Sequence, residues 1–342
     1  MKTIIKLMIC LCFCFSQGQS IERQVIGSSG STLSNGTVTL DFTVGELAVT
    51  TITDGTTTLT QGFHQASVIL GIKIHPKAFL QGALLNSTDN FMRDDLRESY
   101  IPVTSPYSDG LTCDVSVFTD GGTSGSGLAQ DNIVDWILVE LRDATDNTVV
   151  KYSQSALLQR DGDIVGVDGV SNLEFPVAAK SYYVAIKHYN HLGIMTLNTV
   201  SLSDVLATVD FTDANNQITF GTDAQTTFGV PNGVVAMWAG DTNGDGRINY
   251  SGALSDVPGI RSQVFNDPDN SVFGGPPVAS YQSEGYNGTD VDMNGLTVYS
   301  GGSSDVLHVR NNIFNNPSNS IFGGPPTSTY LFTQQLPEGA NN

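Results

Sequence analysis

A short stretch beginning at residue 241 places oxygen-bearing side chains at alternate positions. They stand at positions 1, 3 and 5, and a glycine follows at position 6: Asp241, Asn243, Asp245 and Gly246. This is the order of the first half of an EF-hand calcium loop. A hard cation takes roughly six to eight oxygen ligands, and alternate residues of a tight loop point inward. The spacing therefore predicts a calcium (Ca2+) site, with the Arg247 carbonyl as a further ligand and Ile248 as a hydrophobic anchor.

The same pattern recurs at a constant offset of 49 residues. Three oxygen-bearing residues and a glycine again occupy positions 1, 3, 5 and 6: Asp290, Asp292, Asn294 and Gly295. Residues 241–277 align without gaps to residues 290–326, and 19 of the 37 positions are identical. Identity of this extent indicates a duplicated module. We therefore predict a second calcium site, in which Leu296 offers its carbonyl.

The ligand that closes each loop is displaced from its usual place. Position 12 is Gly252 in the first loop and Gly301 in the second, so the nearest acids are Asp256 and Asp305 at position 16. Apolar residues at 257, 260, 264 and 265 have helical spacing, which predicts a short helix with Asp256 at its N-cap and a matching helix after Asp305. The alternative is that both loops are Asx turns without an ion. Duplication with the late Asp kept in both copies favours calcium.

The pair of loops resembles the duplicated calcium repeat of dockerin-type modules. The chain as a whole resembles a family of hemagglutinin-like exported proteins of the Bacteroidota, and this resemblance implies a secreted or cell-surface location. The stretches that carry it are residues 24–26, 42–46, 59–65, 92–97, 134–142, 156–163, 182–188 and 190–193.

Two further groups of residues suggest chemistry less strongly. His188 and His191 are three residues apart at the end of a predicted strand, and on an extended strand they would point to opposite faces. We therefore expect a strand end and turn with hydrogen-bonding imidazoles, and a metal or catalytic pair is the alternative. Asp161, Asp163 and Asp168 flank a short apolar run and are expected in hairpin turns. A third calcium site and a pair of carboxylates for acid–base chemistry are the alternatives for these three residues.

Other residues are expected to be structural. Charges alternate along residues 92–97, which predicts an exposed local ion-pair network. The family resemblance implies the alternative, in which Arg93 or Arg97 ties this loop to the β-sandwich. Trp136 lies in an apolar run and is expected in the core, whereas Trp238 is expected to pack against the first calcium loop. Cys113 is expected in a buried strand.

The first twenty residues have the pattern of a secretory signal peptide. Lys2 and Lys6 flank an apolar run that ends before a polar segment, and the run is too short to span a membrane. Its removal takes two lysines and no acid, which changes the formal net charge from −19 to −21. Three of the four cysteines leave with it, so no disulfide framework is expected. The negative charge argues against nucleic acid as a partner and favours cations.

Short β-branched and aromatic runs separated by turn residues predict a mainly β chain. We expect a signal peptide (1–20), a small N-terminal antiparallel β unit of four strands (21–66) and an antiparallel β-sandwich (67–212). A connecting segment (213–240) and a C-terminal duplicated calcium-loop module with short helices (241–342) follow. The strands expected in the sandwich lie at residues 72–74, 78–80, 115–117, 133–139, 149–152, 164–167 and 182–186.

No phosphate-binding glycine loop, nucleophile elbow or zinc-binding cysteine cluster occurs in the sequence. We therefore predict a secreted or cell-surface protein of adhesion or structural type that is not an enzyme, whose C-terminal repeats bind calcium. A dockerin-like module that binds a surface protein, or a glycan-binding module, is the alternative, and a hydrolase is the third class. No transmembrane segment is expected in the mature chain.

Overall fold

The computed structural model describes residues 71–87, 90–121, 127–271, 274–320 and 323–338, together with the backbone of four short strands between residues 29 and 59. The chain divides into two compact units, Met1–Ile69 and Leu70–Asn342. The expected β-sandwich and the expected repeat module therefore belong to one compact unit. The predicted signal peptide lies outside the described residues.

The N-terminal unit contains four described strands, which form two antiparallel pairs. β1 (Ser29–Ser34) pairs with β2 (Thr39–Val44), and β3 (Ile52–Thr53) pairs with β4 (Thr58–Leu59). Among the described residues each pair is a separate two-stranded sheet.

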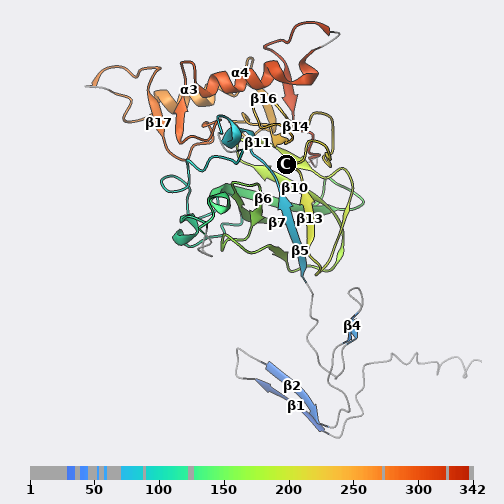
Figure 1. Cartoon of the computed structure of the whole chain (residues 1–342). Helices are drawn as coiled ribbons and strands as arrows, with labels where there is room; N and C mark the ends of the chain where they lie inside the picture. Colours follow the sequence, from blue (N-terminus) through green and yellow to red (C-terminus); the bar gives the residue numbers. More distant parts are fainter. Residues whose placement is uncertain are drawn as a thin grey trace, which may run out of the picture. The chain divides into compact units, whose positions relative to one another are not determined.

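The second unit is built around two sheets that share one hydrophobic core (Figure 1). The larger sheet has the order β11-β10-β6-β7-β8, with β12 also paired to β10, and the smaller has the order β13-β5-β9. The strands of the larger sheet are β6 (Ile133–Asp143), β7 (Val150–Gln159), β8 (Ile164–Val165), β10 (Lys180–His188), β11 (His191–Met195) and β12 (Val200–Leu202). Those of the smaller are β5 (Ile72–Lys77), β9 (Leu173–Phe175) and β13 (Ala207–Asp210). The prediction of a mainly β, largely antiparallel chain is confirmed.

The middle of the larger sheet is buried on both faces because its sequence is almost continuously apolar. β6 has neighbours on both sides and hardly any exposed residue, and Trp136 at its centre is 0% exposed, as expected. Its indole Nε1 donates to the Pro102 carbonyl at 2.7 Å. At the end of β6, Arg142 donates from Nε and Nη2 to Glu140 and from Nη1 to the Pro337 carbonyl, which attaches the C-terminal segment to the sheet.

Two expected strands are wrong. Residues 78–80 follow β5 without forming a strand, and Leu80 makes only an isolated bridge to Met237. Residues 115–117 lie in the 3-10 helix η1 (Val115–Phe118), because the Asp114 carboxylate accepts from the Ser116 amide and closes a turn there. The prediction that Asp256 stands at the N-cap of the helix that follows it is confirmed, although its side chain makes no capping hydrogen bond. Cys113 lies outside any strand and is half-buried.

Short elements complete this unit. The helix α2 (Gln81–Leu84) follows β5, and the 3-10 helix η2 (Ala129–Asp131) precedes β6. β14 (Gln225–Thr226) and β15 (Ala236–Met237) form a pair before the repeats. No described helix is long and apolar enough to cross a membrane.

The duplicated module exchanges strands between its two copies. The first copy contains β16 (Arg247–Asn249), α3 (Val257–Phe265) and β17 (Gln282–Glu284). The second contains β18 (Leu296–Val298), α4 (Asp305–Asn315), the 3-10 helix η4 (Pro317–Asn319) and β19 (Leu331–Thr333). β16 pairs with β19 and β17 with β18, so the strand after each loop pairs with the last strand of the other copy. This reciprocal pairing joins the copies into one module.

The two helices confirm the helical spacing of the sequence and lie next to each other at one end of the unit (Figure 1). Ile260 and Val264 of α3 and Val309 and Ile313 of α4 are buried at equivalent positions. Ile260, Val309 and Ile313 form one hydrophobic cluster with Trp238, Ile248 and Phe332. The expected packing of Trp238 against the first loop is thereby confirmed.

Candidate metal centre

The first carboxylate of each loop organises the loop backbone. Asp241 accepts from the Asp245 amide at 3.0 Å and from the Gly246 amide at 2.9 Å. Asp290 accepts from the equivalent amides of Asn294 and Gly295 at 3.1 and 2.7 Å. Glycine at position 6 permits this turn, since its φ is +73° in the first loop and +85° in the second. We call residues 241–249 the first loop and residues 290–298 the second loop.

The acid at position 16 reaches back to the beginning of its own loop. Asp256 accepts from the amides of Thr242 and Asn249, both at 2.8 Å. Asp305 accepts from the equivalent amides of Val291 and Val298, at 2.6 and 2.7 Å. The acid stands at position 16 instead of position 12, four residues later than in an EF-hand loop. In both copies its carboxylate nevertheless hydrogen-bonds to the backbone of its own loop.

In the second loop three carboxylates converge. Asp290, Asp292 and Asp305 are buried, and each places an oxygen within 4.8 Å of an oxygen of the other two. This donor set consists of hard oxygen ligands, the chemistry that calcium prefers. A calcium ion would also supply the positive charge that this buried group needs, because His308 is the basic side chain within ion-pair distance of it among the described residues. The residues present therefore fit a divalent cation.

Burial and mutual repulsion raise the pKa of the loop carboxyls. Burial, with the Asp245 charge, raises the pKa of Asp241 from 3.8 to about 6. Burial, with the Asp241 charge, raises the pKa of Asp256 from 3.8 to about 7. In the second loop, burial and the Asp292 charge raise the pKa of Asp305 to about 7, and burial with both neighbouring acids raises that of Asp290 well above 3.8. A bound cation would reverse this balance and favour the ionised forms.

The other predicted ligands lie at the loop itself. Asn243 accepts from the Asp245 amide at 3.0 Å, and both side chains are exposed. Asn294 accepts from the Leu296 amide at 2.8 Å. Arg247 and Leu296 begin the strands β16 and β18 that follow the loop heads.

Sequence analysis missed one residue of the second site. The Nε2 atom of His308 lies 3.5 Å from an Asp292 carboxylate oxygen and has no hydrogen-bond partner. His308 follows Asp305 by three residues on α4, so both side chains face the loop. The equivalent residue of the first copy is Gly259, and this difference between the copies was a signal available in the sequence.

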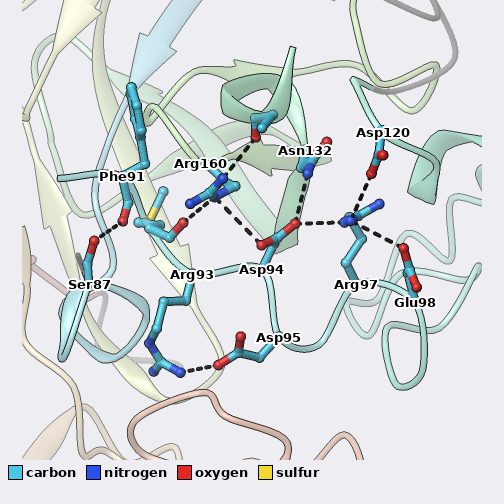
Figure 2. Close-up of polar contacts among 12 residues, drawn as sticks. Ser87, Phe91, Arg93, Asp94, Asp95, Arg97, Glu98, Asp120, Asn132 and Arg160 are labelled. Carbon is cyan, nitrogen blue, oxygen red and sulfur yellow. Dashed lines mark hydrogen bonds and ion pairs between the residues drawn. The ribbon is translucent and has the colours of Figure 1, made fainter. Parts of the chain in front are cut away.

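The segment 92–97 forms the predicted ion-pair network (Figure 2), but the network is largely buried instead of exposed, since the Arg97 and Asp94 side chains are 10% and 22% exposed. Asp94 accepts from Arg97 at 2.8 Å and from Asn132 at 2.9 Å, and it lies 3.6 Å from Arg160. Arg97 also donates to the Phe118 carbonyl at 2.7 Å. Arg93 points away from this group, pairs with Asp95, and donates to the Asp292 carbonyl of the second loop.

The histidine pair is buried and shares one side of a hairpin. His188 and His191 oppose each other at the ends of β10 and β11, and their Nδ1 atoms are 3.0 Å apart. The expected strand end and turn with hydrogen-bonding imidazoles is confirmed. Because residues that flank a two-residue turn face the same side, the two rings meet instead of pointing to the opposite faces of an extended strand. His191 Nε2 accepts from the Gly82 amide at 3.1 Å, so this imidazole is neutral with its proton on Nδ1. His188 donates from Nε2 to Asp135 at 3.2 Å.

The acids at 161–168 have structural partners. Asp163 pairs with Lys77 at 2.6 Å and with His75 at 3.1 Å. Asp168 accepts from the amides of Val170 and Ser171 and so closes a turn, as expected. Burial raises the pKa of the Cys113 thiol to about 11, which opposes formation of a reactive thiolate.

Comparison with known proteins yields little. No protein-family model and no curated protein matches the chain. It is similar to a chain in the structure of an N-terminal interface mutant of a type II cohesin–X-dockerin complex from Acetivibrio cellulolyticus, with 20% identity and a TM-score of 0.28 over 52% of this chain and 79% of that one. It is also similar to a chain of a C-terminal interface mutant of the same type of complex, with 16% identity and a TM-score of 0.30 over 71% and 95% of the two chains. Similarity at this level assigns neither an activity nor a partner.

Proposed function

We propose that this protein is an exported, non-enzymatic protein of adhesion or structural type whose C-terminal repeats bind two calcium ions. The observation that carries the proposal is the return of Asp256 and Asp305 to their own loops through identical pairs of backbone hydrogen bonds. An Asx turn at the head of the loop needs no acid at position 16 of the motif. The signal-like segment at residues 1–20 supports export.

Calcium would supply the charge that holds the module together. Each loop carries two carboxylates and is closed by a third, Asp256 or Asp305, and the mutual repulsion of the three opposes the closed loop when no cation is present. An ion bound by Asp241, Asn243, Asp245 and Asp256, with the equivalent residues of the second copy, would favour the closed form of both loops. Since the copies exchange strands, order in one loop stabilises the other.

The absence of enzymatic activity is supported by the pairing of the reactive groups. Asp135, His188 and His191 are buried and hydrogen-bond among themselves, so the imidazoles have no access to substrate. Asp163 is engaged by Lys77 and His75. In the described part of the chain these residues are structural rather than free to transfer protons.

Terbium luminescence tests the proposed binding directly. The Tyr100 ring lies against the second loop, because a Cβ on Gly295 would be 2.5 Å from its Cε2 atom. Terbium bound in place of calcium is expected to luminesce when tyrosine is excited, and Tyr100→Phe is expected to weaken the signal. Calcium should displace terbium from both proteins. Emission that calcium does not reduce would contradict the proposal.

The calcium-free protein is expected to depend on pH through the loop carboxyls. These keep their protons in the folded chain up to pH 6–7 but lose them near 3.8 in the unfolded chain. Between these values the unfolded state binds fewer protons, so their contribution to the free energy of unfolding decreases as pH rises. His191 acts in the opposite direction, since burial and the neighbouring His188 lower its pKa well below 6.5.

The contribution of the loop carboxyls to the free energy of unfolding is therefore measured as a difference between the wild type and a variant that lacks two of them. Urea unfolding of the metal-stripped wild type and of the Asp256→Asn, Asp305→Asn variant is followed between about pH 5 and pH 7.5. We expect the wild type to lose stability relative to the variant over this range. Calcium should abolish the loss by holding the carboxylates ionised. Parallel curves for the two metal-stripped proteins would contradict this expectation.

Docking to a protein partner through the repeats is the second candidate function. Asn312 of α4 is buried and donates to Gln81 at 2.9 Å, whereas the equivalent Gln263 of α3 lines an open groove. A partner bound in that groove should be displaced by Asn266→Arg. It should be retained by Asn315→Arg, the equivalent exposed position of α4.

A further inference from the structure

The two loops differ in how they contact the rest of the protein. In the first loop Asn243, Gly244 and Asp245 are exposed. In the second loop Val291 and Met293 are buried, and Met293 belongs to the core of the β-sandwich. The second loop is therefore packed against the sandwich, and the sequence explains this by apolar residues at loop positions that are polar or glycine in the first copy.

Two side chains from the sandwich hold the backbone of the second loop. Asn190 is completely buried, and its amide nitrogen donates to the Asp290 carbonyl at 2.8 Å. The amide oxygen of Asn190 accepts from His191 at 2.6 Å, which fixes the orientation of the amide. Asp290 is the residue at position 1 whose carboxylate accepts from the loop amides, so Asn190 holds the backbone of this residue in place.

Arg93 holds the next ligand residue. Its Nη2 donates to the Asp292 carbonyl and also to the Gly82 carbonyl at 3.2 Å, while Nε donates to the Leu85 carbonyl at 2.8 Å. One planar guanidinium thus joins the helix α2 to the second loop, a geometry that lysine cannot reproduce. In the described part of the chain no side chain of the sandwich makes equivalent contacts with the carbonyls of Asp241 or Asn243.

The close approach of α2 completes this contact. A Cβ on Gly82 would lie 2.3 Å from the Val291 carbonyl oxygen and 3.2 Å from the Met293 side chain. Only glycine allows the loop to lie this close to the helix. The second loop, whose three carboxylates place oxygens within 4.8 Å of one another, is therefore held in place by protein contacts that do not involve the ion.

We propose that Arg93 and Asn190 are positioning residues that hold the second loop in its ligand geometry, so that it binds calcium before the first loop and more tightly. The inference rests on the calcium binding proposed above. With its closing acid, each loop offers three carboxylates and one amide as predicted side-chain ligands, and the first loop also carries Arg247, where the second has Leu296. The difference in affinity then comes from preorganisation, because the first loop must pay the cost of ordering when it binds.

Calorimetric titration of the whole chain with calcium tests the order of binding. The wild type is expected to show two steps, and Asp241→Ala is expected to remove the weaker step and leave the tighter one. Asp290→Ala, at the equivalent position, should remove the tighter step. Two equal steps, or a tighter first loop, would overturn the inference while leaving calcium binding intact. A chain that binds no calcium would instead overturn the proposed function.

Variants of the positioning residues separate their role from general stability. In the Asp241→Ala background, Arg93→Lys and Asn190→Ala are each expected to weaken calcium binding roughly 10–100-fold, the usual effect of residues that orient metal ligands. In the Asp290→Ala background the same changes should leave the affinity of the first loop unchanged. Arg97→Lys is the matched control, because Arg97 belongs to the same segment but donates to Asp94 and Phe118. Equal losses at both loops would contradict the assignment.

Discussion

Calcium is expected to raise the free energy of unfolding of this protein by roughly 2.7 kcal/mol per site when free ion exceeds Kd a hundredfold. The reason is that the folded loops bring together carboxylates that the unfolded chain holds apart, so the ion binds the folded state. The closing acids return to both loops through matching hydrogen bonds, so both sites should contribute. Thermal or urea unfolding with calcium and after metal stripping measures the effect.

Single-site variants make this measurement specific. Asp241→Ala and Asp290→Ala should each remove part of the calcium-dependent stabilisation, with the larger loss for Asp290→Ala because the second loop binds more tightly, and the double variant should remove all of it. Asp204→Ala, in the connection between β12 and β13, is the control and should retain the full effect. Calcium-dependent stabilisation that survives in the double variant would place the ion elsewhere in the chain.

Asp135→Ala is expected to cost about 3–5 kcal/mol, the usual effect of removing one partner from a buried charged network. The Asp135 carboxylate is 0% exposed and accepts from three donors. These are the Tyr286 hydroxyl at 2.6 Å, the Trp136 amide at 2.7 Å and His188 Nε2 at 3.2 Å. Removal of the carboxylate would leave these donors buried without an acceptor, which is the origin of the cost.

The conservative variant separates charge from hydrogen bonding. Asp135→Asn retains an oxygen for Tyr286 and Trp136, so we expect a smaller loss than for Asp135→Ala. Urea unfolding in the presence of calcium is the measurement, because it keeps the loops occupied in all proteins. A loss below about 1 kcal/mol for Asp135→Ala would mean that water replaces the carboxylate. Because Tyr286 precedes the second loop, its hydrogen bond to Asp135 also connects the sandwich to the repeats.

The sequence predicted features that local spacing encodes. Strand β6 follows from its continuous apolar run, and helices α3 and α4 follow from apolar residues at helical spacing. The loop heads follow from oxygen-bearing residues at alternate positions. Because the motif recurs at a constant offset, both loops could be predicted from the sequence, and the structure shows equivalent hydrogen bonds in the two loops.

Features that depend on contacts between distant segments were not predicted. The exchanged strands β17 and β19 have three residues each, too few to show alternation. The face shared by His188 and His191 depends on the two-residue length of the turn between them, which the spacing of the histidines does not determine. The contact of Arg93 with Asp292 joins residues 199 positions apart, and no local pattern encodes it.

Equilibrium dialysis of calcium against the purified protein tests the central claim most directly. The wild type is expected to bind two calcium ions per chain, Asp241→Ala and Asp290→Ala one each, and the double variant none. These numbers follow from two loops that each close with their own acid. A wild type that binds no calcium, or a double variant that binds as many ions as the wild type, would contradict the account.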